Sequence, residues 1–259
     1  MNLYLIKRCP FYCIPMLSLY LLILVAVSLS TAEYQGGQKP EADCKVPVEF
    51  PQGKRDTFIK NINERRQLMV KGEQKNGKNG GKLPKGENVL EMEWSCELER
   101  KAIDALNKTC SPKSPDAQTT GLLYQDNGSK QDPMDVWLSE INDKSIELHS
   151  HPEAPVKYTG VNERYCNLVR YDAPHIGCAE RECDGKKTTF CLIDQPPLQK
   201  GDVVYYWGKG ECPTGKCRPP SSGCHTETGL CFKPVPTTTP ATTTGKRMFC
   251  HPFYGCVEV

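Results

Sequence analysis

The sequence lacks the motifs of the commonest catalytic sites. It contains no G-x-S-x-G, no H-E-x-x-H and no P-loop pattern, which argues against the enzymes that those motifs mark. Its net charge is only +2, whereas a nucleic-acid binder needs a concentrated basic face. Beyond the first thirty residues, no apolar run is long enough to cross a bilayer. These absences favour a binding protein without a cofactor, and a hydrolase is the least favoured alternative.

The first thirty-two residues have the organisation of a secretory signal peptide. Lys7 and Arg8 are followed by an apolar run from Met16 to Val27 and by the small residues Ser30, Thr31 and Ala32. This order predicts cleavage before Glu33 and export of the mature chain. The alternative is an uncleaved membrane anchor, but the apolar run is short for a span of about 20 residues.

Cysteine is abundant, with 15 in the chain. Loss of Cys9 and Cys13 with the signal peptide leaves an odd number, and in an oxidising compartment this density predicts disulfides. One thiol must then be free or pair with another molecule, which leaves a disulfide-linked dimer open. The spacings within the pairs Cys212 and Cys217, Cys224 and Cys231, and Cys250 and Cys256 lack the short x2 of zinc ribbons. Sequence alone does not give their connectivity.

Two N-glycosylation sequons agree with export. They are Asn107-Lys108-Thr109 and Asn127-Gly128-Ser129, and both asparagines are candidate glycan sites.

The chain divides by composition into six segments. After the signal peptide (1–32) come an extended leader (33–53) and a core domain (54–212) long enough for one hydrophobic core. A cysteine-rich extension (213–236), a threonine-rich linker (237–245) and a short tail (246–259) follow. The extension has too little apolar content to bury a core and must be held by disulfides.

Within the core domain, helical patterns precede strand patterns. Apolar spacing predicts helices over 54–70, over 92–110 and from Asp132 to Leu148, and three strands are predicted over 175–183, 186–194 and 202–210. Helices followed by strands indicate an α+β fold, with helices packed on a mostly antiparallel sheet.

Several of these pieces resemble the CAP superfamily of cysteine-rich secretory, venom-antigen and pathogenesis-related proteins. The resemblance lies in the helix "MEWSCELERKA", the fragment "VWLSEI" and the strands "IGCAEREC", "FCLI" and "YYWGKGEC". The likeness is greatest to the activation-associated, venom-allergen-like proteins of parasitic nematodes. It implies a three-layer α-β-α sandwich over about residues 54–212, stapled by disulfides. By analogy, Cys178 would bond Cys191, Cys183 would bond Cys212 and Cys96 would bond Cys166. The analogy fixes no partner for Cys44 or Cys110 and leaves a bond between these two open.

The family's cleft, with two histidines and two acids, is degenerate in this sequence. The first histidine position carries Ile62 and the second carries Arg164, while Glu140 of W-x-x-E is the one acid retained. Isoleucine cannot ligate a metal and a guanidinium repels one, so no family-type zinc site is expected. Arg164 either pairs with Glu140 or both side chains face solvent.

Two other groups of residues could carry a binding function. His149 and His151 could share a metal if extended, but a helix end before a proline favours solvated loop histidines. Part of Tyr205-Tyr206-Trp207 must face outward and could contact a lipid or a protein.

The resemblance therefore implies a secreted, non-catalytic protein that binds a host protein or lipid, in parasite–host interaction or immune modulation. A carrier of sterol or another small lipid is the alternative.

Overall fold

The structure is a computed structural model that describes residues 34–42, 44–236, 248–251 and 255–258. The predicted signal peptide, with Cys9 and Cys13, and the predicted threonine-rich linker lie outside the described residues. Across the ranges that are described, no helix is both long and apolar enough to span a membrane.

A four-stranded sheet forms the middle of the core. Its strand order is β3 (Glu93–Trp94), β6 (His175–Cys183), β7 (Lys186–Ile193) and β4 (Thr120–Gln125). β3 runs parallel to β6, and the other neighbours are antiparallel. β6 and β7 form a hairpin whose turn residues, Asp184 and Gly185, both have positive φ, which suits the twist of antiparallel strands.

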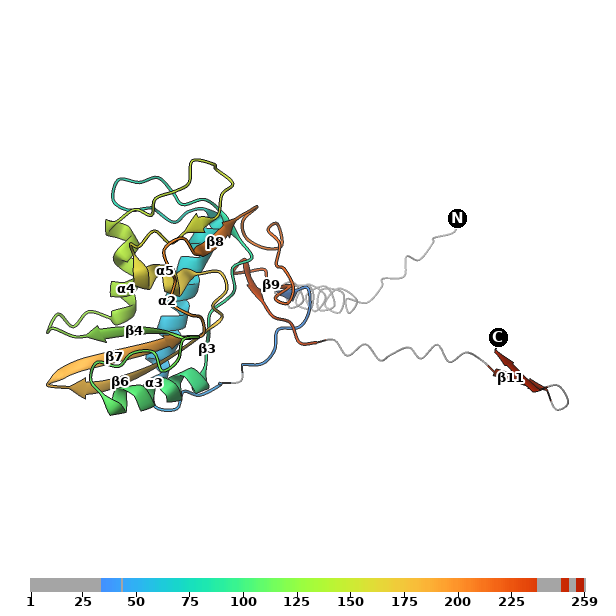
Figure 1. Ribbon diagram of the computed structural model, residues 1–259, viewed down its shortest axis with the longest axis horizontal. Coiled ribbons are helices and arrows are strands. Elements are labelled where there is room, and N and C mark those ends of the chain that lie inside the picture. The colour runs from blue at the N-terminus through green and yellow to red at the C-terminus, as the bar shows by residue number, and fades with distance from the viewer. Residues whose placement is uncertain (1–33, 43, 237–247, 252–254, 259) are drawn as a thin grey trace, which may run out of the picture.

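Helices cover both faces of this sheet and give three layers (Figure 1). α3 (Cys96–Lys108) packs on one face, and α2 (Gln52–Lys71), α4 (Pro133–Asp143) and α5 (Glu163–Val169) lie on the other. Successive strand residues point to opposite faces, so Cys178 joins the core under α2 whereas Ala179 joins the core under α3. The predicted α+β class and the three-layer α-β-α sandwich are confirmed.

The helix ends follow local sequence signals. Asp132 Oδ1 accepts the N–H groups of Met134 and Asp135, and Pro133 occupies the first turn of α4, as N-caps favour. Ser95 Oγ accepts the N–H of Leu98 at the start of α3. Gly72, with a φ of 68°, follows the last residue of α2. Glycine suits this left-handed position because it has no Cβ that would strain the backbone there.

Two features of the helices differ from the sequence expectation. α4 ends at Asp143 rather than reaching Leu148, whose side chain is exposed. α5 was not predicted, because seven residues are too few to show a helical period.

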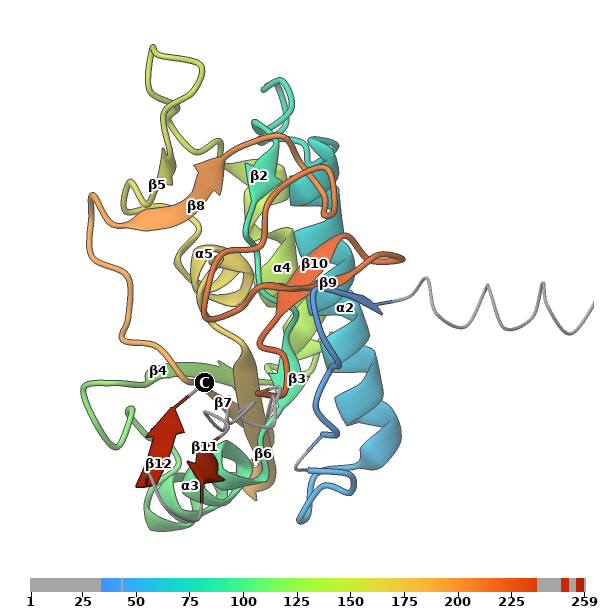
Figure 2. The same ribbon diagram turned by 90° about the vertical axis from the view of Figure 1, so that its right-hand side faces the viewer.

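The leader and the cysteine-rich extension pair with each other beside the core. β1 (Tyr34–Gln35), β9 (Gly223–His225) and β10 (Leu230–Phe232) form one small sheet, in which Tyr34 lies opposite His225. Another sheet contains β2 (Gly86–Glu87), β8 (Val203–Trp207) and β5 (Val156–Lys157). Figure 2 shows the leader passing beside β9 along α2. β11 (Met248–His251) and β12 (Gly255–Glu258) form a hairpin in the tail.

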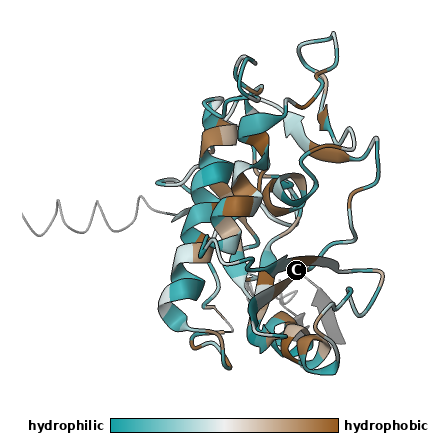
Figure 3. Ribbon diagram, turned by 90° about the vertical axis from the view of Figure 1, so that its left-hand side faces the viewer, coloured by the Kyte–Doolittle hydropathy of each residue, from teal (hydrophilic) through white to brown (hydrophobic). Residues whose placement is uncertain are grey.

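Hydrophobic residues lie mainly on the inward sides of these elements. Figure 3 shows brown positions facing neighbouring helices and strands, while the outer loops are largely teal. The bulkiest fully buried side chains include Trp137, Tyr165, Tyr205 and Phe58. The core therefore sits between α2, α4, α5 and the sheet, with a smaller core under α3.

Five disulfides staple the described residues. Cys178 bonds Cys191 across β6 and β7, as the resemblance implied. The others are Cys44–Cys96, Cys110–Cys183, Cys212–Cys224 and Cys217–Cys231.

Three of the expected cysteine pairings are wrong. Cys96 opens α3 next to the leader, so Cys44 reaches it and Cys166 does not. Cys183 ends β6 beside the end of α3, where Cys110 lies, and Cys212 closes a short loop within the extension instead. Cys44 and Cys110 therefore do not pair with each other. Cys166 is a buried free thiol on α5.

Candidate functional site

The acidic residue retained from the family cleft holds the start of α5. Glu140 projects from α4, and its Oε2 accepts the backbone N–H groups of Arg164 at 2.9 Å and Tyr165 at 3.1 Å. The residue before α5, Asn162, has a φ of 57° and makes no side-chain cap. Because the first N–H groups of a helix have no partner within it, Glu140 caps α5 from a different helix.

The second oxygen of Glu140 binds the side chain at the degenerate histidine position. Arg164 Nη1 donates to Glu140 Oε1 at 2.9 Å, so the two side chains form the ion pair that the sequence left open. Arg164 is 50% exposed, and an ion pair with that much water around it contributes little to stability. The two backbone hydrogen bonds therefore contribute more to stability than the ion pair does.

Ile62 lies in the core rather than at a ligand position. It is fully buried on α2 and belongs to the same apolar cluster as Trp137 and Tyr165. Of the three family cleft positions in this chain, one is aliphatic, one is a guanidinium and the third is a carboxylate already bonded through both oxygens. This donor set does not fit zinc, whose protein ligands are imidazole, thiolate and carboxylate groups.

Two buried polar residues of α2, Asn63 and Arg66, bond to the backbone of other segments. Asn63 donates to and accepts from the backbone of Met92. Arg66 is fully buried and donates to the carbonyls of Leu90, Leu168 and Ala173 at 2.5–3.2 Å. Burial lowers the pKa of Arg66 to about 9, against the opposing effect of nearby aspartates. These side chains join loops to α2, which is a structural role.

A second buried carboxylate anchors the leader. Glu99 on α3 is fully buried, and it accepts the N–H groups of Glu49 and Phe50 and the indole N–H of Trp94 at 2.7–2.8 Å. Sequence reasoning passed over Glu99, although an acidic residue beside Leu98 on an apolar helix stripe was the available signal. Gly177 lets β6 approach α3 closely, because a Cβ there would lie 2.2 Å from the Glu99 nitrogen.

The two neighbouring histidines are turned toward their own loop. His149 Nδ1 accepts the N–H of His151 at 3.1 Å, and His151 Nδ1 accepts the N–H of Glu153 at 3.3 Å. Both residues are exposed. Hydrogen bonds of this kind are typical of turns, where a side chain substitutes for a backbone acceptor.

The aromatic run on β8 divides between core and surface. Tyr205 is buried and donates its hydroxyl to the Pro84 carbonyl at 2.8 Å, whereas Tyr206 and Trp207 are exposed. Tyr206 packs edge-on against Tyr171 with 5.0 Å between ring centroids. Part of the run faces outward, as predicted.

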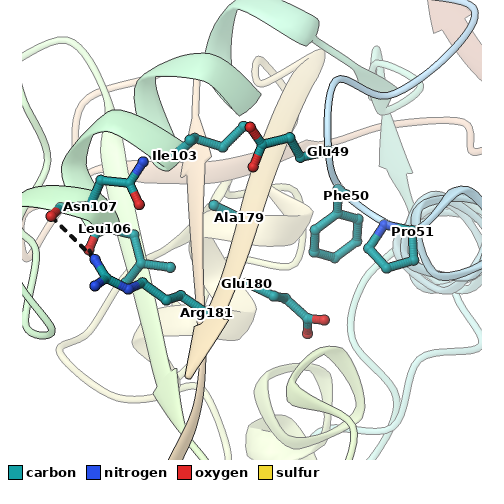
Figure 4. A pocket seen from close by; sticks show the side chains of 9 residues that line it. All are labelled: Glu49, Phe50, Pro51, Ile103, Leu106, Asn107, Ala179, Glu180 and Arg181. Atoms are coloured by element: carbon teal, nitrogen blue, oxygen red, sulfur yellow. Dashed lines mark hydrogen bonds between the residues drawn. The ribbon is translucent and has the colours of Figure 1, made fainter. Parts of the chain in front are cut away.

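Two cavities lie away from the degenerate cleft. One, of about 550 Å³, lies between α3, β6 and the segment that leads into α2 (Figure 4). Another, of about 440 Å³, lies between the leader, the segment before β3 and the extension. Its lining combines the apolar Leu90, Phe232 and Val235 with charged residues that include Glu91, Glu93 and Lys233.

Comparisons with known proteins agree with this architecture. The model of the cysteine-rich secretory protein family, CAP, matches residues 59–194. Ancylostoma secreted protein from Ancylostoma caninum is 24% identical over 214 residues, covering 77% of this chain and 49% of that protein. The chain thus spans about half the length of this curated relative.

Solved structures show the same fold. BmVAL-1 has a TM-score of 0.59 at 23% identity and covers 75% of this chain and 100% of its own. NaASP2 with Zn²⁺ has a TM-score of 0.55 at 21% identity and covers 70% of this chain and 96% of its own. Because the family model matches more than half of the chain, this chain belongs to the cysteine-rich secretory protein (CAP) family and is related to secreted nematode proteins.

Proposed function

We propose that this chain is a secreted, glycosylated protein that acts by binding a host protein and not by catalysis. The observation that supports the proposal is the state of Glu140. Both of its oxygens are used by the start of α5 and by Arg164, and Ile62 fills the core. The carboxylate that the resemblance assigns to the family cleft thus accepts three hydrogen bonds from the start of α5 and from the Arg164 side chain, and it holds structure. A role in parasite–host interaction follows from the relation to secreted nematode proteins.

The metal side of the proposal is tested by equilibrium dialysis of the purified chain against zinc, followed by metal analysis. We expect substoichiometric zinc in the wild type and no change in Glu140→Ala. One zinc per chain that is lost in Glu140→Ala would show that the cleft still holds a metal, and the proposal would be overturned.

The proposed binding is tested with the full chain purified from the culture medium of a eukaryotic expression system. The labelled chain is titrated onto cells of the parasitised host, with and without an excess of unlabelled chain. We expect saturable binding that the unlabelled chain displaces and that trypsin treatment of the cells abolishes. Binding that survives trypsin but disappears after lipid extraction of the cells would point to a lipid instead.

A carrier of sterol or another small lipid is the second candidate. The cavity of about 440 Å³ favours it, because Leu90, Phe232 and Val235 give it an apolar wall, as lipid sites require. An organic-solvent extract of the purified chain, analysed by mass spectrometry, separates the two functions. A stoichiometric lipid in the extract supports the carrier, and a lipid-free chain that still binds cells supports the protein ligand.

A further inference from the structure

The cavity in Figure 4 lies at the outer edge of the layer formed by α3. Ile103, Leu106 and Asn107 line it from α3, and Ala179, Glu180 and Arg181 line it from β6. Its remaining wall is the segment Glu49-Phe50-Pro51, which leads into α2. The volume of about 550 Å³ is within the range of small-ligand sites.

The lining combines apolar and charged groups. Pro51 and Ile103 provide accessible carbon surface beside the buried Phe50, while Glu49 and Arg181 are exposed at the rim. A lipid tail would place carbon against those charges, which must keep their hydration. A carbohydrate has both C–H faces and hydroxyl groups, and it matches such a wall.

A site of sugar attachment belongs to this wall. Asn107 opens the sequon Asn107-Lys108-Thr109, and its side chain is exposed in the last turn of α3. In Figure 4 its carboxamide is turned toward the side of the cavity where Ile103 lies. Because an N-linked glycan is attached to the asparagine side-chain nitrogen, its first sugar starts at the cavity.

The attachment point is held rigidly. Arg181 Nη1 donates to the carbonyl of Asn107 at 3.2 Å, and the disulfide Cys110–Cys183 joins the chain after α3 to the end of β6. Binding groups held on braced helices and strands lose little freedom when they are occupied. The second sequon is different, because Asn127 lies in the exposed loop between β4 and α4 and does not line this cavity.

We propose that the N-linked glycan on Asn107 seats its first sugars in this cavity and covers Pro51 and Ile103. The inference rests on the proposed secretion and glycosylation of the chain, and it adds a defined place for one glycan. The glycan then replaces water over an apolar surface that would otherwise be exposed.

The test uses the full chain secreted from a eukaryotic host, with Asn107→Gln and, as the matched control, Asn127→Gln. Mass spectrometry gives the occupancy of each sequon, and amide hydrogen exchange is measured at Glu49, at Phe50 and over residues 103–107. We expect Asn107→Gln to exchange about fivefold faster there, equivalent to about 1 kcal/mol of local protection. Asn127→Gln should exchange like the wild type.

Thr109→Ser keeps the sequon and separates loss of sugar from a change at the end of α3. It should retain both the glycan and the wild-type exchange. Trimming the glycan enzymatically to a single sugar should preserve most of the protection, because the first sugar is the one that occupies the cavity.

The outcomes separate this inference from the proposal on which it rests. Occupied Asn107 with unchanged exchange in Asn107→Gln would overturn the seating of the glycan. Occupied Asn127 with bare Asn107 would overturn this inference and leave secretion intact. Two bare sequons would overturn the proposed glycosylation and this inference with it.

Discussion

Replacing Glu140 by alanine should destabilise the protein mainly by uncapping α5. The substitution removes the acceptor for the N–H groups of Arg164 and Tyr165. Loss of a helix cap costs about 1 kcal/mol and up to about 2 kcal/mol. The ion pair adds at most about 0.5 kcal/mol because Arg164 is half exposed. We expect about 2 kcal/mol for Glu140→Ala, which corresponds to a fall in Tm of about 4–8 °C for a domain of this size.

Two further variants separate the cap from the ion pair. Arg164→Ala keeps the carboxylate on both backbone N–H groups and should cost about 0.5 kcal/mol. Glu140→Gln keeps one acceptor oxygen but loses the charge, and should cost about 1 kcal/mol. Glu147→Ala, at an exposed glutamate on the loop after α4, is the control and should stay within about 0.5 kcal/mol of the wild type.

The measurement is urea unfolding with the disulfides intact, followed by tryptophan fluorescence and analysed at constant m. Trp137 is buried on the same helix as Glu140, so it reports on that region. The small effect of Arg164→Ala should shrink at high salt, since exposed charges are screened, whereas the effect of Glu140→Ala should persist. If Arg164→Ala costs as much as Glu140→Ala, the capping argument is refuted.

Two other predictions follow from the buried groups. Cys166 should resist alkylation in the native chain and react only after unfolding, because burial, with the negative charge of Glu140, raises the pKa of its thiol; a dimer on a nonreducing gel that Cys166→Ser abolishes would contradict this. Glu91→Gln should flatten the acid limb of the stability curve. Burial alone would raise the pKa of Glu91, but the hydrogen bond with His225 and the charge of Lys39 outweigh it, so the pKa lies below its ordinary value. A depressed pKa gives stability that is present above the unfolded value of about 4.3 and is lost as the pH falls through the folded value. Thermal unfolding between about pH 6 and pH 3 measures the difference between wild type and variant, and parallel curves would contradict the prediction.

The elements with long, periodic patterns could be predicted from the sequence. The helix expected over 54–70 is α2, and the strands expected after Pro174 are β6, β7 and β8. These elements can be predicted because apolar residues recur in the sequence with the period of a helix or of a strand. The end of α4 at Asp143 was not readable, since Ile146 and Leu148 continue the apolar stripe although the chain has left the helix.

The disulfides show where sequence reasoning stops. Cys178–Cys191 joins two strands of one hairpin, so local pairing places the two sulfurs together. Cys44–Cys96 joins residues 52 positions apart and depends on where the leader crosses α3. That crossing is set by Glu99, which binds the leader's N–H groups at Glu49 and Phe50, and no local pattern encodes such a contact.

The surroundings of α5 give Glu140 a structural role that does not depend on a metal. A metal ligand acts only together with its partners, and Ile62 and Arg164, at the two other positions that the resemblance assigns to the cleft, cannot be such partners. Glu140 differs, because its backbone contacts at Arg164 and Tyr165 do not depend on the side chain at position 164. Tyr165 and Cys166 lie fully buried behind those contacts, so uncapping α5 would loosen part of the core. In this chain the carboxylate of Glu140 therefore serves the fold itself, and its presence is by itself no sign of a metal site.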